Sequence, residues 1–366
     1  MPVGRLAIVG TGLIGASVGL AAKRAGVERV VGYDADERAL GVAVERGAAD
    51  ETAGTLDEAV ADADLVVVAV PVGTVGNVVR AVLDSSDGSS TVTDVGSTKA
   101  AVAAGVAGHD RFIGGHPLCG SEAHGPAHAR ADLFESATWF LTPTASTDPP
   151  RYRTLHAFVA SLGAVPVAVD PDAHDRLLAL TSHLPHALAN LLLNQAGAGR
   201  IEGHEPLDAT AGSFRDMTRV AGANPRIWVD IFLANAGPLA DALAEHRRRV
   251  ERLETALVAG DAGYLARWIG EAGENRRRLL AEAYPDAGRL QRVVVRVPDR
   301  PGVLAGITHA LGAERINIED FELQHVSPER GGTLAVLVSG DEQAARAAAL
   351  LEAQGYDVDV APVFAP

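Results

Sequence analysis

The sequence predicts an α/β domain built on a parallel sheet, followed by an all-α domain and a small α+β domain. Short apolar runs alternate with helical patterns up to about residue 170. No run of β-branched residues occurs from there to residue 293, and strand and helix patterns then follow in the order βαββαβ. We therefore expect domains at 1–170, 171–284 and 291–366, with a turn-rich linker at Tyr284–Gly288.

The first domain shows the alternation of strands and helices that builds parallel sheets. Strands are expected at 5–9, 29–33, 65–70, 90–94, 111–114, 137–142 and 164–169. Helices are expected at 13–25, 36–46, 56–61, 73–83, 98–107 and 150–162. Asp36 and Ser97 are the expected N-cap residues of two of these helices, because their side chains can accept from the first free amides.

The other two domains differ in composition. The second is rich in Ala, Leu, Glu and Arg, which favours helices at 172–198, 207–221, 225–257 and 261–283. The third shows strand patterns at 292–297, 315–322, 333–338 and 356–361, and helical patterns at 301–312 and 341–354. This order is typical of a small two-layer α+β domain.

Composition argues against several classes of function. The 366-residue chain has a formal net charge of −15 and no basic run longer than three residues, so we expect no nucleic acid partner. No stretch of about 18 uncharged apolar residues occurs, and the first residues lack a signal-peptide pattern. The single cysteine, Cys119, permits no internal disulfide. We expect a soluble, cytoplasmic protein that binds no membrane.

A glycine-rich loop opens the first domain. The motif Gly10-x-Gly12-x-x-Gly15 directly follows the apolar run Leu6–Val9 and opens a helical pattern, the context that a dinucleotide-binding Rossmann fingerprint requires. The first glycine permits a tight turn, the second lets backbone amides approach a pyrophosphate, and the third lets helix and strand pack closely. The residues expected to contact the cofactor are Gly10, Gly12, Leu13, Ile14 and Gly15.

Asp34 indicates which dinucleotide binds. It ends the second expected strand, nineteen residues after Gly15, where the adenosine ribose is expected. Its carboxylate would accept a hydrogen bond from the ribose 2′-hydroxyl and would repel the 2′-phosphate of NADP. The next arginine, Arg38, lies four residues further on. NAD is therefore the expected cofactor.

Polar residues after two further strands suggest a catalytic base, because ligands of open α/β sheets bind at the carboxyl ends of strands. His116 follows one of these strands, and the motif Asp94–Lys99 follows the other. Histidine has an intrinsic pKa suited to proton transfer near neutrality. We expect His116 to be the base and Ser97 to hydrogen-bond both His116 and a substrate hydroxyl.

The helical domain supplies candidates for substrate contacts. A proline interrupts the helical pattern within Thr181–His186, and Arg215 and Arg219 lie four residues apart. The planar guanidinium of arginine suits a carboxylate. His183 and His186 have the spacing of two metal ligands, but the sequence offers no third ligand at a convincing distance, so we expect no metal.

Together these motifs resemble the prephenate dehydrogenase family, which includes the arogenate dehydrogenases. The matching stretches are Gly10–Gly15, Asp94–Lys99, Gly114–Ser121, Thr181–Ala187, Gly212–Val220 and Asn224–Phe232. The resemblance implies an oxidative decarboxylation in tyrosine biosynthesis: ring C4 of prephenate gives a hydride to NAD⁺, the 4-hydroxyl loses its proton, and CO₂ leaves as 4-hydroxyphenylpyruvate forms. It also implies a homodimer that forms through the helical domain.

The resemblance also implies roles for individual residues. His116 matches the acceptor of the 4-hydroxyl proton, Ser97 matches its hydrogen-bonding partner, and Arg219 matches a position that holds a substrate carboxylate. The other residues implied to line the substrate pocket are His186, Ser121, Ser182, Gly212 and Trp228. Prephenate and arogenate differ in one keto or amino group. The sequence leaves this choice open, with Glu122 a candidate for contact with the arogenate ammonium.

Residues 291–366 resemble an ACT domain, through the segments Pro298–Ile307 and Ile316–Asp320. In that family such segments help to form amino-acid sites, often at a dimer interface, so tyrosine is the expected effector. The residues implied are Asp299, Arg300, Gly302, Val303, Leu304, Asn317 and Ile318. A module that only dimerises, or that binds nothing, is the alternative, since fold does not fix function.

Two other functions fit parts of the pattern. The β-hydroxyacid dehydrogenases combine a Rossmann domain with a helical domain, but they rely on a lysine there, and residues 171–290 contain none. A non-enzymatic sensor of NAD and an amino acid would leave His116, Ser97 and Arg219 without a purpose. We therefore expect an NAD-dependent dehydrogenase of prephenate or arogenate.

Overall fold

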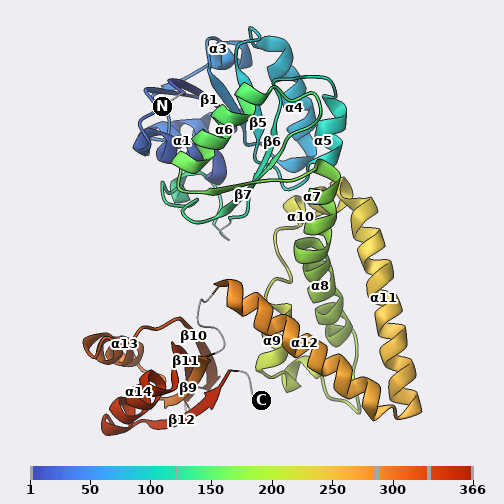
Figure 1. Cartoon of the computed structure of the whole chain (residues 1–366), viewed down its shortest axis with the longest axis vertical. Coiled ribbons are helices and arrows are strands. Elements are labelled where there is room, and N and C mark those ends of the chain that lie inside the picture. Colours follow the sequence, from blue (N-terminus) through green and yellow to red (C-terminus); the bar gives the residue numbers. More distant parts are fainter. Residues whose placement is uncertain (1–2, 120–122, 284–288, 328–330, 364–366) are drawn as a thin grey trace. The chain divides into compact units, whose positions relative to one another are not determined.

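The computed structural model describes residues 3–119, 123–283, 289–327 and 331–363 (Figure 1). The chain divides into two compact units, Met1–His246 and Arg247–Pro366. The first unit holds the α/β domain and the first helices of the all-α segment. The second unit holds the remaining helical residues and the C-terminal domain. The boundary falls inside one long helix, α11 (Ala236–Ala259).

A five-stranded parallel sheet forms the centre of the α/β domain, in the order β3-β2-β1-β4-β5. Its strands are β1 (Arg5–Val9), β2 (Arg29–Tyr33), β3 (Glu51–Thr52), β4 (Leu65–Val68) and β5 (Thr91–Asp94). The strands β2 and β3 lie on one side of β1, and β4 and β5 lie on its other side. Val9, at the end of β1, therefore pairs with both Tyr33 and Val68. The carboxyl ends of the central strands therefore meet at one edge, at the switch point where ligands of such sheets bind.

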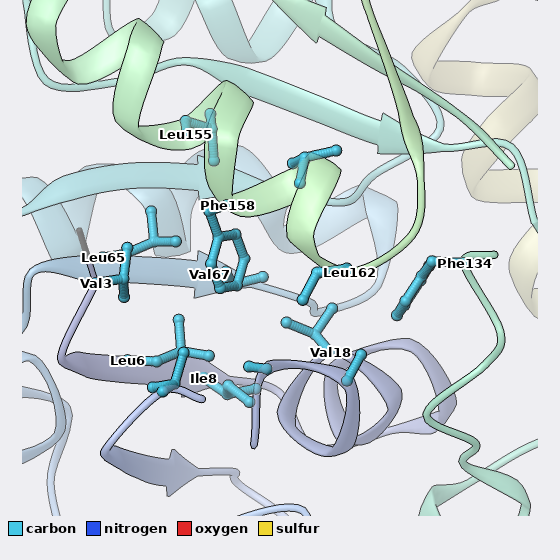
Figure 2. Close-up of a cluster of buried hydrophobic side chains, with 14 of the residues drawn as sticks. Val3, Leu6, Ile8, Val18, Leu65, Val67, Phe134, Leu155, Phe158 and Leu162 are labelled. Atoms are coloured by element: carbon cyan, nitrogen blue, oxygen red, sulfur yellow. The ribbon is translucent and has the colours of Figure 1, made fainter. Parts of the chain in front are cut away.

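Helices cover both faces of this sheet and bury its apolar strands. They are α1 (Leu13–Arg24), α2 (Glu37–Glu45), α3 (Leu56–Val60), α4 (Val72–Ser85), α5 (Ala100–Gly105) and α6 (Pro149–Ser161). The strand β4 reads Leu-Val-Val-Val and is buried throughout, as expected for a strand covered on both faces. Figure 2 shows one of the two large cores, in which Leu155, Phe158 and Leu162 pack against side chains of β1, β4 and α1.

Three later strands form a separate sheet, which differs from the single parallel sheet that the sequence suggested. They are β6 (Gly114–Pro117), β7 (Thr138–Thr142) and β8 (Val165–Ala168), and β6 runs antiparallel to β7. Glycine lets the chain pass close to the end of β5, since a Cβ on Gly115 would lie 2.6 Å from the carbonyl oxygen of Asp94. His116 therefore lies within a strand, opposite Phe140, and not after a strand end.

One of the two expected N-caps is confirmed. The Asp36 side chain accepts from the amides of Arg38 and Ala39 at 2.9 and 3.4 Å. The Ser97 cap is wrong, because the helix α5 begins only at Ala100 and its N-cap residue is Lys99. The free amides at this end are satisfied by a carboxylate distant in sequence, which no local pattern indicates.

The predicted helices 172–198 and 225–257 are each interrupted once, and the predicted helix 207–221 is replaced by a 3₁₀ turn and a separate seven-residue α-helix. The elements of the all-α segment in the first unit are α7 (Pro171–Leu178), the π-helical turn η2 (Ala179–His183), α8 (Leu184–Gly197), the 3₁₀ turn η3 (Pro206–Ala209), α9 (Gly212–Thr218), α10 (Pro225–Ala234) and the start of α11. The π-helical turn precedes Pro185, whose ring removes a backbone donor from the first turn of α8. The second interruption is at Asn235, where α10 and α11 meet at 87°.

No single helix among the described residues is both long and apolar enough to cross a membrane. The helices α10 and α11 satisfy the length and composition criteria only as a bent pair.

The C-terminal domain has the expected order βαββαβ. Its elements are β9 (Leu290–Val297), α13 (Val303–Ala313), β10 (Asp320–Ser327), β11 (Gly331–Ser339), α14 (Asp341–Ala353) and β12 (Asp357–Pro362). They form an antiparallel sheet in the order β10-β11-β9-β12, with a core shared between the strands and both helices. The strand expected at 315–322 starts only at Asp320, because Ile316 leaves the strand path and packs into that core. The long helix α12 (Ala262–Ala283) precedes this domain.

The glycine-rich loop yields a paired stability test. A Cβ on Gly15 would lie 1.9 Å from the carbonyl oxygen of Gly10, whereas a Cβ on Gly12 would meet no described atom within 4 Å. Gly15→Ala should therefore lower the free energy of unfolding by at least about 1–3 kcal/mol, the usual cost of overpacking. Gly12→Ala should lower it by no more than about 1 kcal/mol, because alanine is a poorer N-cap than glycine but meets no atom there, and equal effects in urea titrations would contradict this account of the loop.

Candidate active site

The glycine loop and Asp34 border a cavity of about 440 Å³ at the carboxyl ends of β1 and β2. The amide and hydroxyl of Thr11 donate to Asp34 Oδ2 at 2.5 and 3.0 Å, and the Asp36 amide donates to Oδ1 at 2.9 Å. The carboxylate is thereby held at the rim of the cavity. The lining residues are Val9, Gly10, Tyr33, Asp34, Ala35, Leu56, Val70, Pro71, Thr74, Asn77, Val78 and Ala81.

The surroundings of the loop fit a dinucleotide. The backbone at Gly12, at the N-terminus of α1, faces free space that a Cβ would enter, so a phosphate can approach the amides there. Gly10 has a φ of +98°, which only glycine adopts readily, and its amide donates to the Tyr33 carbonyl at 2.8 Å. The mostly apolar cavity beside Asp34 suits an adenosine.

A buried ion pair joins β5 to β6, and the sequence analysis did not find it. Lys99 and Asp94 are 1% and 0% exposed, and the Lys99 ammonium donates to Asp94 Oδ2. The same ammonium donates to the Gly115 carbonyl at 2.8 Å, while the Gly115 amide donates to Asp94 Oδ1 at 3.2 Å. Both backbone groups of the residue before His116 are therefore held by this pair.

His116 is bonded through Nδ1 to a second histidine. Its Nδ1 lies 2.9 Å from His174 Nε2, and His174 Nδ1 lies 2.8 Å from Asp175 Oδ1. Burial, followed by the nearby charge of Lys99 and the neighbouring His174 and His183, lowers the pKa of His116 well below 6.5. The ring is therefore neutral near pH 7 and able to accept a proton, although part of its surface is exposed.

Asp175 links the all-α segment to the α/β domain. It is 2% exposed, and its two oxygens accept from the amides of Lys99 and Ala100 at 2.8 and 2.9 Å. Burial acts to raise the pKa of Asp175, but the bonds from His174 and these amides outweigh it and hold the pKa below its ordinary value. His174 and Asp175 lie four residues before the buried Leu178 and Ala179, so helical periodicity could have marked both as core-facing.

Ser97 does not bond His116 in this structure. Its Oγ is buried and has no hydrogen-bond partner among the described residues. The Nδ1 atom of His116 is instead bonded to His174. Because an unsatisfied buried hydroxyl is costly, Ser97 is a donor or acceptor available to a ligand at the carboxyl end of β5.

A second and larger cavity, of about 940 Å³, brings together three of the residues expected to bind substrate. They are His186 of α8, Arg219 just after α9, and Trp228 of α10. The described residues that line it are Cys119, His124, His186, Arg219, Val220, Ala221, Gly222, Ala223, Asn224, Ile227, Trp228 and Ile231. Cys119 lies three residues after His116, so the base and the cavity belong to one region of the first unit.

The side chains around this cavity differ in how they are held. The His186 ring stacks on Trp228 with centroids 3.5 Å apart, and its Nδ1 donates to the Ser182 carbonyl at 3.1 Å. Arg219 is exposed and forms no ion pair with any other residue that the structure describes, so its guanidinium is available to an anion. Burial raises the pKa of Cys119 to about 11, which keeps this thiol protonated.

Two further expected substrate residues, Ser182 and Gly212, do not line this cavity. Ser182 contributes its carbonyl to His186, and Gly212 begins α9. Ser121 and Glu122 lie outside the described residues. His124 and Cys119 line the cavity without having been expected, because both lie in or beside a loop that shows no periodic pattern.

His183 is a core histidine in this structure. It is buried, it accepts at Nδ1 from Asn235 Nδ2 at 3.0 Å, and burial lowers its pKa to about 4. The same Asn235 nitrogen, at the C-cap of α10, donates to the Asp175 carbonyl at 2.8 Å. Across the described parts of the chain, no group of three or more His, Cys, Asp or Glu side chains has the arrangement of a metal site.

The C-terminal domain contains a cavity of about 90 Å³ where β9 leads into α13. Four of the expected regulatory residues line it, namely Asp299, Arg300, Val303 and Leu304. Gly302 caps α13 with a φ of +89°. Asn317 and Ile318 do not line it, since Asn317 donates to Glu319 at 3.0 Å and Ile318 packs against the core.

Comparison with family models gives three matches along the chain. Residues 18–168 match the prephenate dehydrogenase nucleotide-binding domain, residues 170–271 match the prephenate dehydrogenase dimerization domain, and residues 291–355 match the ACT domain. These three segments follow one another in the same order as the domains that the sequence predicts.

Individual relatives agree with these matches. The chain is 32% identical to a prephenate dehydrogenase of Bacillus subtilis over 95% of both chains, and 34% identical to a cyclohexadienyl dehydrogenase of Zymomonas mobilis over 76% of this chain and 96% of that one. Among solved structures, Aquifex aeolicus prephenate dehydrogenase in complex with hydroxyphenyl propionate and NAD⁺ superposes with a TM-score of 0.71 at 28% identity, over 75% of this chain and 98% of that one. Synechocystis arogenate dehydrogenase superposes with a TM-score of 0.68 at 29% identity, over 75% and 99%. The chain belongs to the prephenate dehydrogenase family.

Proposed function

We propose that this chain is an NAD-dependent prephenate dehydrogenase, which converts prephenate to 4-hydroxyphenylpyruvate and CO₂ in tyrosine biosynthesis. The observation that carries the proposal is His116, a histidine that burial keeps neutral, three residues before Cys119 of the cavity that contains Arg219 and in the same compact unit as the glycine loop. A base, a hydride acceptor and a carboxylate contact are the three groups that this reaction needs.

NAD is the cofactor, and it supplies the hydride acceptor when it is bound. Gly12 leaves the amides of the loop open, and Asp34 still has lone pairs free to accept from a ribose hydroxyl. The acidic residues Asp36 and Glu37 follow Asp34, so the surroundings repel a 2′-phosphate. The NAD⁺ present in the Aquifex aeolicus complex supports the same assignment.

The residues of this chain contribute proton transfer and positioning. We infer that the free nitrogen of His116 accepts the proton of the 4-hydroxyl, which raises electron density at ring C4 and favours loss of the hydride from that carbon. Arg219 holds a substrate carboxylate, and the stacked rings of His186 and Trp228 form a wall beside it. Aromatisation of the ring drives the loss of CO₂, so the protein need not form a covalent bond to the substrate.

Arogenate is the second candidate substrate. A cyclohexadienyl dehydrogenase and an arogenate dehydrogenase are among the similar proteins. The two substrates differ in one side-chain group, and Glu122 is the residue we propose for contact with the ammonium of arogenate.

We also propose that tyrosine regulates the enzyme through the C-terminal domain. The small cavity beside Asp299, Arg300 and Leu304 offers charged and apolar groups side by side, as recognition of an amino acid requires.

We further propose a homodimer formed through the dimerization domain. Exposed apolar residues on α11 and α12, such as Val258 at 86% and Ile269 at 63%, support an apolar contact there.

Initial rates test this function directly. Formation of the reduced cofactor should be fastest with prephenate and NAD, slower when NADP replaces NAD, and slower when tyrosine is added. No NADH from either prephenate or arogenate would reject the enzymatic function, and faster reaction with NADP would reject the role of Asp34.

A chain lacking residues 291–366 should keep its activity and lose inhibition by tyrosine. Equal inhibition of that chain would place the tyrosine site elsewhere.

Replacement of the base should lower turnover without loss of cofactor. His116→Asn removes a proton acceptor, so kcat should fall by about 10²–10⁴, the usual contribution of a general base. NAD affinity, measured by calorimetry, should stay within a factor of about two, because Asp34 and the loop are unchanged. His109→Asn, at an exposed histidine, is the matched control. Unchanged turnover of the first variant would remove His116 from the mechanism.

Replacement of the carboxylate contact should act mainly on KM. Arg219→Ala deletes a charge-assisted contact worth about 1.5–3 kcal/mol, so KM for prephenate should rise about 10- to 100-fold. Arg215→Ala provides the control, since this arginine is exposed on α9 and does not line the cavity. A loss of kcat alone in Arg219→Ala would contradict a binding role.

A further inference from the structure

The three side chains His116, His174 and Asp175 form one continuous hydrogen-bonded chain whose buried end is the carboxylate. His174 is fully buried, and the described groups that bond the Asp175 carboxylate are all donors: the Lys99 amide, the Ala100 amide and His174 Nδ1. A carboxylate in such surroundings is ionised and can only accept hydrogen bonds.

Because Asp175 accepts from His174, the direction of the next hydrogen bond, between His174 and His116, is fixed as well. Because Asp175 can only accept, His174 donates to it from Nδ1, and the singly protonated ring that this bond requires has a free lone pair on Nε2. His174 Nε2 must then accept from its neighbour, so the hydrogen of His116 is on Nδ1. The nitrogen of His116 that remains unprotonated is Nε2.

Ring packing holds the geometry of this chain. The rings of His116 and His174 meet edge-on with centroids 5.1 Å apart at 72°. Phe140, the residue opposite His116 in the β6–β7 pair, also meets His174 edge-on, with centroids 5.4 Å apart at 86°. The donor and acceptor atoms therefore stay aligned without help from Ser97.

We propose that His174 and Asp175 are positioning residues that fix His116 in the tautomer whose Nε2 is unprotonated and can act as a base. This inference deepens the proposed function and rests on it for the identity of the reaction. When Nε2 takes the 4-hydroxyl proton, Nδ1–H continues to donate to His174, and the negative charge of Asp175 stabilises the imidazolium through that ring. The Nδ1 proton of His116 does not transfer to His174 or Asp175. The same holds in hydrolases in which an aspartate orients the catalytic histidine without taking up its proton.

The tautomer can be measured without any substrate. In protein labelled with ring-¹⁵N histidine, the resonances of His116 and His174 are assigned by their loss in His116→Asn and His174→Gln. We expect His116 to be protonated at Nδ1 only and His174 at Nδ1 only, at pH 7. A hydrogen on Nε2 of His116 would overturn the proposal even if the chain proved to act on another substrate.

Asp175→Asn tests the same point by removing the negative charge at the buried end of the chain. The amide nitrogen of asparagine must face either His174 Nδ1 and the Lys99 amide or the Ala100 amide, all of which are donors, so the hydrogen bonds that orient His174 cannot all be kept. We expect kcat to fall by about 10²–10⁴ per NAD-binding site, with NAD affinity and KM for prephenate nearly unchanged. Asp172→Asn, at an exposed position on α7, is the matched control.

His174 offers a rescue comparison. The amide oxygen of His174→Gln can still accept from His116 Nδ1, whereas His174→Leu cannot, so the glutamine variant should turn over about tenfold faster or more. Equal kcat in the two variants, or wild-type kcat in Asp175→Asn, would overturn the proposal. A wild-type chain that fails to oxidise prephenate or arogenate would instead reject the proposed function, and the ¹⁵N measurement would still decide the tautomer.

Discussion

The buried carboxylate of Asp175 is the constraint on which the rest of the site depends. Removing a carboxylate from water is costly unless donors surround it, and here the donors come from α5 of the α/β domain and from His174 of α7. A shift of α7 relative to α5 would leave this charge and two helix-end amides unsatisfied. Asn235, which bonds the Asp175 carbonyl and His183, extends the same constraint to the break between α10 and α11.

A second buried charged group, the ion pair of Lys99 and Asp94, holds the backbone next to His116. Lys99 and Asp94 hold both backbone groups of Gly115, so the short strand β6 has little freedom where it carries His116. The positive charge of Lys99 also contributes, after burial, to the low pKa of His116. One ion pair thus sets the position of the base and favours its neutral form. The glycines of β6 are required because Asp94, Lys99 and Thr142 leave no room for side chains.

The sequence predicted the local features well and the distant ones poorly. The order of elements, the glycine loop and the Asp36 cap follow from patterns within a few residues of one another. The family resemblance supplied His186, Arg219 and Trp228, which line the larger cavity. The antiparallel pairing of β6, the role of Asp175 as the cap of α5 and the bond from His116 to His174 join residues that are far apart in the chain. Such contacts depend on tertiary packing, which single-sequence periodicity does not encode. Ser97 illustrates the difference, since its motif was recognised but its partner was not.

In the proposed reaction, one site in the first unit places His116 opposite the hydroxyl and Arg219 on a carboxylate of the same substrate. A crystal structure of the wild-type chain with NAD⁺ and a 4-hydroxyphenyl carboxylate analogue tests this most directly. We expect the analogue's hydroxyl about 2.6–3.2 Å from His116 Nε2 and its carboxylate bonded to the Arg219 guanidinium. An analogue bound away from His116, or held with its carboxylate on another residue, would contradict the account.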